Sequence, residues 1–186
     1  MSPVESIKIF LPISFFGTWG AVLYLLYKWR GDKSMSISRH AAKHKKAYLL
    51  MLIVETITFS LFFLFVYKWF VPTFKLPSFF NVLIAVSCGG FIVAALIPDV
   101  SGRKGIIHSL SAYTASMVFI PALALMFVSY EISNYAKVVI IFALIFQLGS
   151  VSAFMVIKNA KNYHLYIQSM YFLVFDLSLL AATYIR

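Results

Sequence analysis

Two acidic residues, Glu55 and Asp176, each interrupt a stretch of about twenty otherwise apolar residues. A charged side chain inside a membrane costs several kcal/mol, so acids in such stretches usually mark a proton or cation path or the site of a buried polar ligand. No Lys or Arg lies at a comparable depth, and we therefore expect one or both carboxyls to be protonated. The structural alternative is a neutral carboxyl that hydrogen-bonds a Tyr, Ser or Gln of a neighbouring helix.

Other polar side chains have positions that could bring them near the two acids. Thr58 follows Glu55 by one helical turn, and Gln147 and Ser150 form a similar pair in a later apolar stretch. Counted from the same side, Glu55 lies roughly 13 Å and Asp176 roughly 20 Å along their helices, so a side chain or one water could join them. We predict a polar seam that binds or passes a small ligand, proton or cation, made of Glu55, Thr58, Gln147, Ser150 and Asp176.

A second group of candidates lies where the third apolar stretch turns into the fourth. Asp99 belongs to this turn, His108 follows about one turn into the next helix, and His164 opens the last helix on the same side. A His–Asp pair can act as acid and base on a lipid carbonyl, which gives the alternative of a membrane-embedded lipid-modifying enzyme with Asp99 and His108 as catalytic candidates. His108 and His164 are weak metal or haem candidates. A purely structural histidine is the simpler account, and we predict no metal and no cofactor.

These residues must be positioned by membrane helices. The chain of 186 residues is 62% hydrophobic and only 12% charged, with a mean hydropathy of +0.90, which a water-soluble domain could not bury. Six apolar stretches are each long enough to cross a hydrocarbon core of about 30 Å as a helix, and none shows the alternation of a membrane barrel. We predict a single all-α domain over 1–186, a polytopic six-helix bundle with short loops and spans at roughly 9–27, 48–71, 79–97, 106–129, 135–157 and 163–185.

Small residues and prolines inside the predicted spans bear on how the helices pack. The pair Gly89 and Gly90 and the small residues at 111–116 could allow two helices to approach closely. Pro121 lacks a backbone donor and could kink the fourth span. One cysteine, Cys88, excludes a disulfide within the chain.

The basic residues predict an orientation. Of the 16 Lys and Arg residues, eleven fall on the side of the 28–46 connection and five on the opposite side. Because cytoplasmic loops carry an excess of Lys and Arg, we predict a protein of the cell membrane with 28–46 in the cytoplasm and both termini outside. The net charge of +10 could also indicate binding to anionic lipid or nucleic acid. Anchoring is the simpler account, and we predict membrane lipids as partners and no nucleic acid.

Three short segments carry a resemblance to a known family: IPD at 97–99, HSLSA at 108–112 and FIPALAL at 119–125. They resemble a bacterial and archaeal family of multi-helix membrane proteins known as domain of unknown function 998. More distantly, the histidine-plus-alanine pattern is similar to the eukaryotic family of autophagy modulators and lipid-anchor remodelling proteins. The resemblance covers about a fifth of the chain. It implies six spans and makes Asp99 and His108 the positions that matter most to the family, without implying a reaction.

Three functional classes follow from the sequence. The first is a non-enzymatic membrane protein that uses the polar seam, and the second is the lipid-modifying enzyme. The third is an accessory subunit whose buried acids bond a helix of a partner, in a homo-oligomer or a larger membrane complex.

Overall fold

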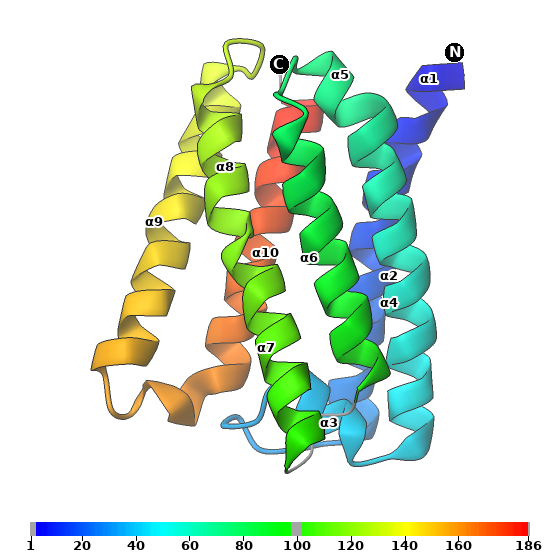
Figure 1. The fold of residues 1–186 in the computed structure, drawn as a ribbon, viewed down its shortest axis with the longest axis vertical. Coiled ribbons are helices and arrows are strands. Elements are labelled where there is room, and N and C mark those ends of the chain that lie inside the picture. The colour runs from blue at the N-terminus through cyan, green and yellow to red at the C-terminus, as the bar shows by residue number, and fades with distance from the viewer. Residues whose placement is uncertain (1–2, 98–101, 186) are drawn as a thin grey trace.

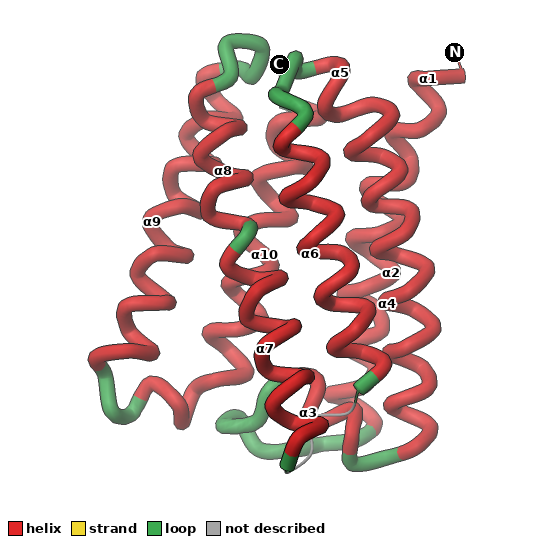
Figure 2. Tube along the Cα trace, in the orientation of Figure 1, coloured by secondary structure: helices red, strands yellow, loops and turns green. Residues whose placement is uncertain are grey.

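A computed structural model describes residues 3–97 and 102–185, which form helices and turns with no strand (Figures 1 and 2). The π-helical turn Val66–Phe70 continues the helix before it, and short 3-10 turns precede the first and last long helices at Ile7–Ile9 and Ala160–Tyr163. The α-helices are α1 (Pro3–Ser6), α2 (Phe10–Lys28), α3 (Ile37–Ala42), α4 (Lys45–Phe65), α5 (Val71–Thr73), α6 (Phe79–Leu96), α7 (Arg103–Met117), α8 (Phe119–Val128), α9 (Asn134–Val156) and α10 (His164–Tyr184).

Six helical segments among the described residues are long and apolar enough to cross a membrane, which confirms the predicted all-α bundle. Apolar side chains that point away from the bundle, such as Leu23, Ile53, Phe142 and Ile145, are more than half exposed, as expected for positions that face lipid. The predicted span ends all lie within three residues of the observed ones, which are Ile7–Lys28, Lys45–Thr73, Phe79–Leu96, Arg103–Val128, Asn134–Val156 and Ala160–Tyr184.

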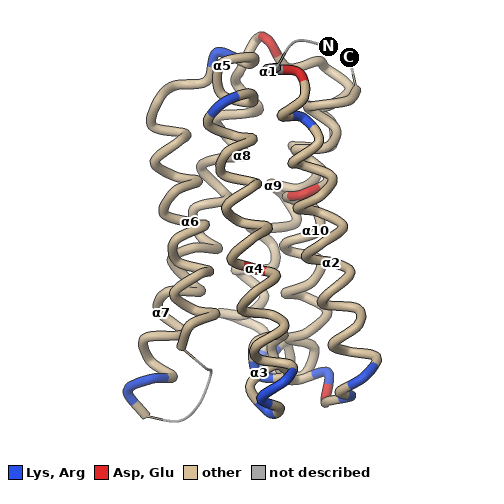
Figure 3. The backbone as a smooth tube through the Cα atoms, turned by 90° about the vertical axis from the view of Figure 1, so that its right-hand side faces the viewer, with Lys and Arg blue, Asp and Glu red and all other residues tan. Residues whose placement is uncertain are grey.

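Consecutive spans pack against one another, because short connections favour antiparallel neighbours. Helix α2 packs on α4, α4 on α6, α6 on α7, α8 on α9 and α9 on α10, and α10 then returns to contact α2 and α3. The helices thus form a ring that closes between the last span and the first. Both termini lie at one end of the bundle, and α3 crosses the other end (Figures 1 and 3).

Two local features shape the fourth span. Pro121 cannot donate a backbone hydrogen bond to Met117, and the span is interrupted between α7 and α8 at Val118. A Cβ added to Gly90 on α6 would lie 2.8 Å from the Cβ of Ala115 on α7, so only glycine permits this approach of the two helices. The prediction of close contact is therefore confirmed for Gly90. It is wrong for Gly89, where an added Cβ would meet no atom within 4 Å.

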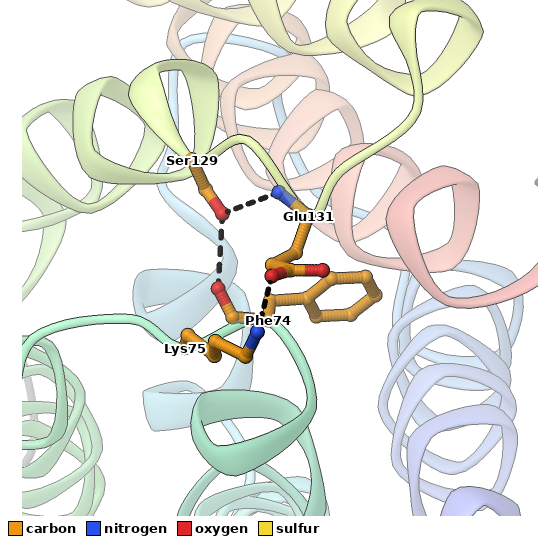
Figure 4. Close-up of polar contacts among 4 residues, drawn as sticks. All are labelled: Phe74, Lys75, Ser129 and Glu131. Atoms are coloured by element: carbon orange, nitrogen blue, oxygen red, sulfur yellow. Dashed lines mark hydrogen bonds and ion pairs between the residues drawn. The ribbon is translucent and has the colours of Figure 1, made fainter.

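The end of the bundle that holds the termini is fastened by polar contacts between two loops (Figure 4). Lys75, in the turn between α5 and α6, donates a hydrogen bond of 2.7 Å to the Glu131 carboxylate in the loop between α8 and α9. Ser129 Oγ donates to the Phe74 carbonyl at 2.9 Å and accepts from the Glu131 backbone N–H at 3.4 Å. These contacts join the connection between the second and third spans to the connection between the fourth and fifth.

Candidate functional site

A cavity of about 140 Å³ lies inside the ring of helices. On α4 its wall includes Tyr48, Met51, Glu55, Thr58 and Phe62, a stripe with helical spacing that extends over about 20 Å of helix rise. Comparable stripes of α2, α6 and α10 and the first half of α7 complete the wall, with one residue of α8, and α3 lies at one end. An engineered protein cavity of about 150 Å³ binds benzene, so the space suits a ring-sized molecule.

Both intramembrane acids line this cavity, from α4 and α10 respectively. Trp19 on α2 donates a hydrogen bond of 2.9 Å from Nε1 to Oδ2 of Asp176, so the Asp176 carboxyl is held in place. The half-buried Glu55 carboxyl receives no hydrogen bond from any residue in the described part of the chain. Figure 3 shows acidic positions in the middle of the bundle, whereas Lys and Arg gather near its two ends.

Hydroxyl groups lie beside the acids at the contact between α2 and α4. Thr18 Oγ1 donates to Thr58 Oγ1 at 2.9 Å, and Ser14 Oγ lies 2.9 Å from the Thr58 carbonyl, which it bonds across the same contact. The helices can approach here because Gly17 faces Thr58: an added Cβ would lie 2.9 Å from Thr58 Cγ2. Thr58 follows Glu55 by one turn of α4. The close contact with α2 holds the Thr58 side chain in the cavity wall.

Most of the remaining wall is aromatic and apolar, and no Lys or Arg is among its described residues. The Phe91 ring on α6 stacks on Phe59 of α4 at a centroid distance of 5.3 Å and meets Phe172 of α10 edge to face, also at 5.3 Å. Phe15 of α2 completes this group on the cavity wall. Two carboxyl groups thus share a largely apolar, aromatic space, and the basic side chain among its described wall residues is His108 at the α3 end.

The end of the cavity beside α3 is closed by hydrogen bonds between elements. His108 Nε2 lies 2.9 Å from Ser38 Oγ, while His108 Nδ1 lies 2.9 Å and 2.7 Å from the carbonyls of Ala94 and Ile97. An Nδ1–H tautomer satisfies both carbonyls and leaves Nε2 to accept from Ser38. On the other side, Gln168 Oε1 accepts from the backbone N–H of Ile37 at 3.0 Å. These contacts hold α3 across the cavity end.

The structure brings together only part of the predicted seam. Glu55, Thr58 and Asp176 line one cavity, but Gln147 and Ser150 on α9 do not. Gln147 is fully buried and donates from Nε2 to the Tyr171 carbonyl at 3.1 Å, whereas Ser150 Oγ bonds its own helix at the Phe146 carbonyl. The grouping of these two residues with the acids is therefore wrong, because α9 lies outside the helices that enclose the cavity.

The predicted rim cluster is also only partly gathered. His108 is buried at the cavity end, but His164 packs edge to face on Phe154 at 5.2 Å and is absent from the cavity wall. Asp99 lies outside the described residues. Within residues 3–97 and 102–185, no three His, Cys, Asp or Glu residues are grouped so that they could hold a metal ion.

Several residues of the site were not identified from the sequence. Trp19, Ser38 and Gln168 carry hydrogen bonds that organise the cavity. The indole N–H of Trp19 is a hydrogen-bond donor in the middle of a span. It is easily overlooked when Trp is counted only as an apolar aromatic residue. Ser38 lies on the short helix α3, in the connection between the first two spans, and its role depends on the placement of α3 over the cavity end.

The chain was compared with protein-family models, with curated proteins and with solved structures, and it matches none of them.

Proposed function

We propose that this integral membrane protein binds a small ligand in the cavity that contains Glu55 and Asp176. Ligand sites are typically apolar cavities with a few converging polar groups, and this cavity has that composition. The observation that carries the proposal is the Glu55 carboxyl, which points to no hydrogen-bond donor among the described residues while it lines the cavity. A bound molecule would supply the missing partner.

A purely structural role accounts for Asp176 better than for Glu55. Asp176 accepts the indole N–H of Trp19 and so connects two helices, as structural glue would. Glu55 makes no such connection, although a carboxyl without a partner is costly at this depth in a membrane. The difference between the two acids favours a ligand role for Glu55 and a supporting role for Asp176.

The proposal includes an orientation. With the connection 28–46 in the cytoplasm and both termini outside, the α3 end of the cavity faces the cytoplasm. A ligand that passes through the protein would cross this end, where His108, Ser38 and Gln168 hold α3 in place. Membrane lipids surround the bundle in this arrangement, in the cell membrane.

The test measures binding of ring-sized probes to the protein in nanodiscs, and compares the wild type with variants whose larger side chains fill the cavity. Benzylamine and benzyl alcohol serve as probes, and Ala112→Phe and Ala95→Leu each place extra atoms in the cavity from a different helix. Ala153→Phe on α9 is the matched control, because Ala153 is not part of the cavity wall.

We expect saturable binding of at least one probe by the wild type and by Ala153→Phe. In the two filled variants, affinity should fall about tenfold or more, equivalent to roughly 1.4 kcal/mol. Thermal unfolding of each variant shows that it is folded. Absence of saturable binding to the wild type, or binding that is equal in the filled variants, would refute the proposal.

A further inference from the structure

We infer that the ligand of this cavity is a lipophilic organic cation, whose ammonium group pairs with Glu55 and whose apolar body contacts the aromatic wall. The inference rests on the proposed function and adds the chemical class of the ligand. It starts from the presence of two carboxyl groups and several aromatic rings in the wall of one cavity.

The charge of the wall excludes one class of ligand and disfavours another. Among the described wall residues there are two carboxyls and no Lys or Arg, and both ring nitrogens of His108 are already hydrogen-bonded to the protein, so an anion would meet two acids and no unoccupied cationic donor. A neutral molecule could donate a hydrogen bond to Glu55, but it would provide no positive charge to a carboxylate in a medium that solvates charge poorly. A cation supplies both the charge and the donors, since an ammonium group carries N–H donors and no acceptor.

The wall also distinguishes an organic cation from a metal ion. Mg²⁺ and Ca²⁺ prefer shells of several oxygen ligands, and Mg²⁺ gives up its waters reluctantly. Here the hydroxyls of Thr18 and Thr58 bond each other, and the wall adds the rings of Phe15, Phe59, Phe91 and Phe172 rather than further carboxylates. Ring faces attract cations and at the same time contact methylene groups and other rings, which is the combination that an organic ammonium presents.

The position of the rings supports the same class of ligand. Phe91 contacts both Phe59 and Phe172 at centroid distances of 5.3 Å, so rings from three different helices form one cluster in the wall. The carboxyls come from α4 and α10, the same two helices that supply Phe59 and Phe172. A molecule that lies in the cavity therefore meets carboxyl and ring groups from the same helices.

The two acids have different roles in this inference. Oδ2 of Asp176 already accepts a hydrogen bond from Trp19, and this bond holds the carboxyl group in one orientation. Glu55 has a longer side chain and no partner among the described residues, so it is free to orient toward an ammonium group. Glu55 is thus the primary contact, and Asp176 contributes to the polarity of the same space.

The experiment compares three probes of nearly equal shape: benzylammonium, benzyl alcohol and benzoate. Binding is measured at pH 7 in nanodiscs of zwitterionic lipid, so that the membrane itself does not concentrate the cation. The variants are Glu55→Gln, which removes the acid with little change in volume, and Glu131→Gln, the same substitution at an exposed position far from the cavity.

We expect the wild type to bind benzylammonium about tenfold more tightly than benzyl alcohol, with weaker binding of benzoate than of either. Glu55→Gln should lower the affinity for benzylammonium about tenfold and change that for benzyl alcohol less than about twofold. Glu131→Gln should match the wild type for all three probes.

The outcomes separate this inference from the proposed function. If benzyl alcohol binds saturably in the cavity and benzylammonium binds no better, the ligand class is wrong while the binding function stands. The same holds if benzoate binds most tightly, or if Glu55→Gln affects both probes equally. If no probe binds saturably, the inference and the proposed function both fall.

Discussion

The indole Nε1–H of Trp19 donates a 2.9 Å hydrogen bond to Oδ2 of Asp176, and this contact joins the first membrane-spanning helix to the last. The two residues are 157 positions apart in the chain, so their contact closes the ring of helices around the cavity. It also gives Asp176 a partner that the sequence pattern alone does not reveal.

A double-mutant cycle should detect this bond as a coupling between Trp19 and Asp176. We expect Trp19→Phe and Asp176→Asn each to lower the free energy of unfolding, and the double variant to lose less than the sum. The coupling should be about 0.6–1.7 kcal/mol, the range found for hydrogen bonds between membrane helices. Unfolding in mixed micelles measures it, and Trp29→Phe with Asp176→Asn is the control pair. Additive effects at Trp19 and Asp176 would contradict the structure.

The bond between Ser38 and His108 should hold α3 over the cavity end. We expect Ser38→Ala to speed hydrogen exchange at the backbone amides of residues 37–42, because His108 Nε2 then loses its partner on α3. Ser152→Ala is the control, since Ser152 is exposed and bonds only within α9, to the Leu148 carbonyl. Unchanged exchange in α3 would show that the helix is held by its other contacts.

Two adjacent glycines should respond differently to the same substitution. At Gly90 an added Cβ would lie 2.8 Å from the Ala115 Cβ and 3.0 Å from the Ser111 carbonyl oxygen, so Gly90→Ala should destabilise the protein by about 1–3 kcal/mol through overpacking. Gly89→Ala meets no atom within 4 Å and should be neutral or slightly stabilising. Thermal unfolding in detergent compares them, and Ala115→Gly should partly rescue Gly90→Ala. Equal effects at both positions would refute the close contact.

The ion pair at the end of the bundle predicts a pH dependence. The hydrogen bond that Lys75 donates to the Glu131 carboxylate raises the pKa of Lys75 above its ordinary value of 10.5. This pair therefore contributes stability below that pH, and the contribution is lost as pH rises through the higher pKa of the folded state. Because the pair is exposed, the effect of Lys75→Met should be small. Its unfolding midpoint should lie below that of the wild type at pH 8 and approach it above pH 11.

The control for this pH series is Lys104→Met, which removes an exposed Lys at the opposite end of the bundle. It should differ from the wild type by the same amount at every pH in the range. A difference for Lys75→Met that grows as pH rises would contradict the ion pair.

The proposed orientation predicts which loops can be labelled in intact cells. Cys88 is the only cysteine, so a Cys88→Ala background allows single cysteines to be placed at Ser34 and at Tyr130, both exposed. We expect a membrane-impermeant maleimide to label Tyr130→Cys in intact cells and Ser34→Cys only after permeabilisation. The reverse pattern would invert the orientation and leave the fold unchanged.

The sequence predicts the spans well, because hydropathy over about twenty residues is a strong and local signal. The same signal shows that Glu55 and Asp176 lie within spans. The sequence also places Thr58 correctly, since Thr58 and Glu55 lie on one helix and their separation follows from helical geometry. Gln147 could not be placed in this way. Its neighbours depend on where α9 lies relative to α10, and a polar residue in the middle of a span does not specify which helix it will face.

Residues that act between elements were harder to predict still. Trp19 becomes a partner of Asp176 only when the first and last spans meet, and Ser38 reaches His108 only when α3 folds across the bundle. Ser36 does carry a local signal, because its side chain accepts the Arg39 backbone N–H as the N-cap of α3. That signal predicts a short helix, but not the cavity beneath it.

The interruption at Val118 divides the fourth span into two parts that pack against different helices. Its first part packs on α6 through Gly90 and carries His108, whereas its second part packs on α9 and leads to the Ser129 and Glu131 contacts. A tilt of the first part would therefore alter the width of the binding space, and the opposite end of the molecule could keep its shape while this happens. One missing amide hydrogen, at Pro121, separates the two parts.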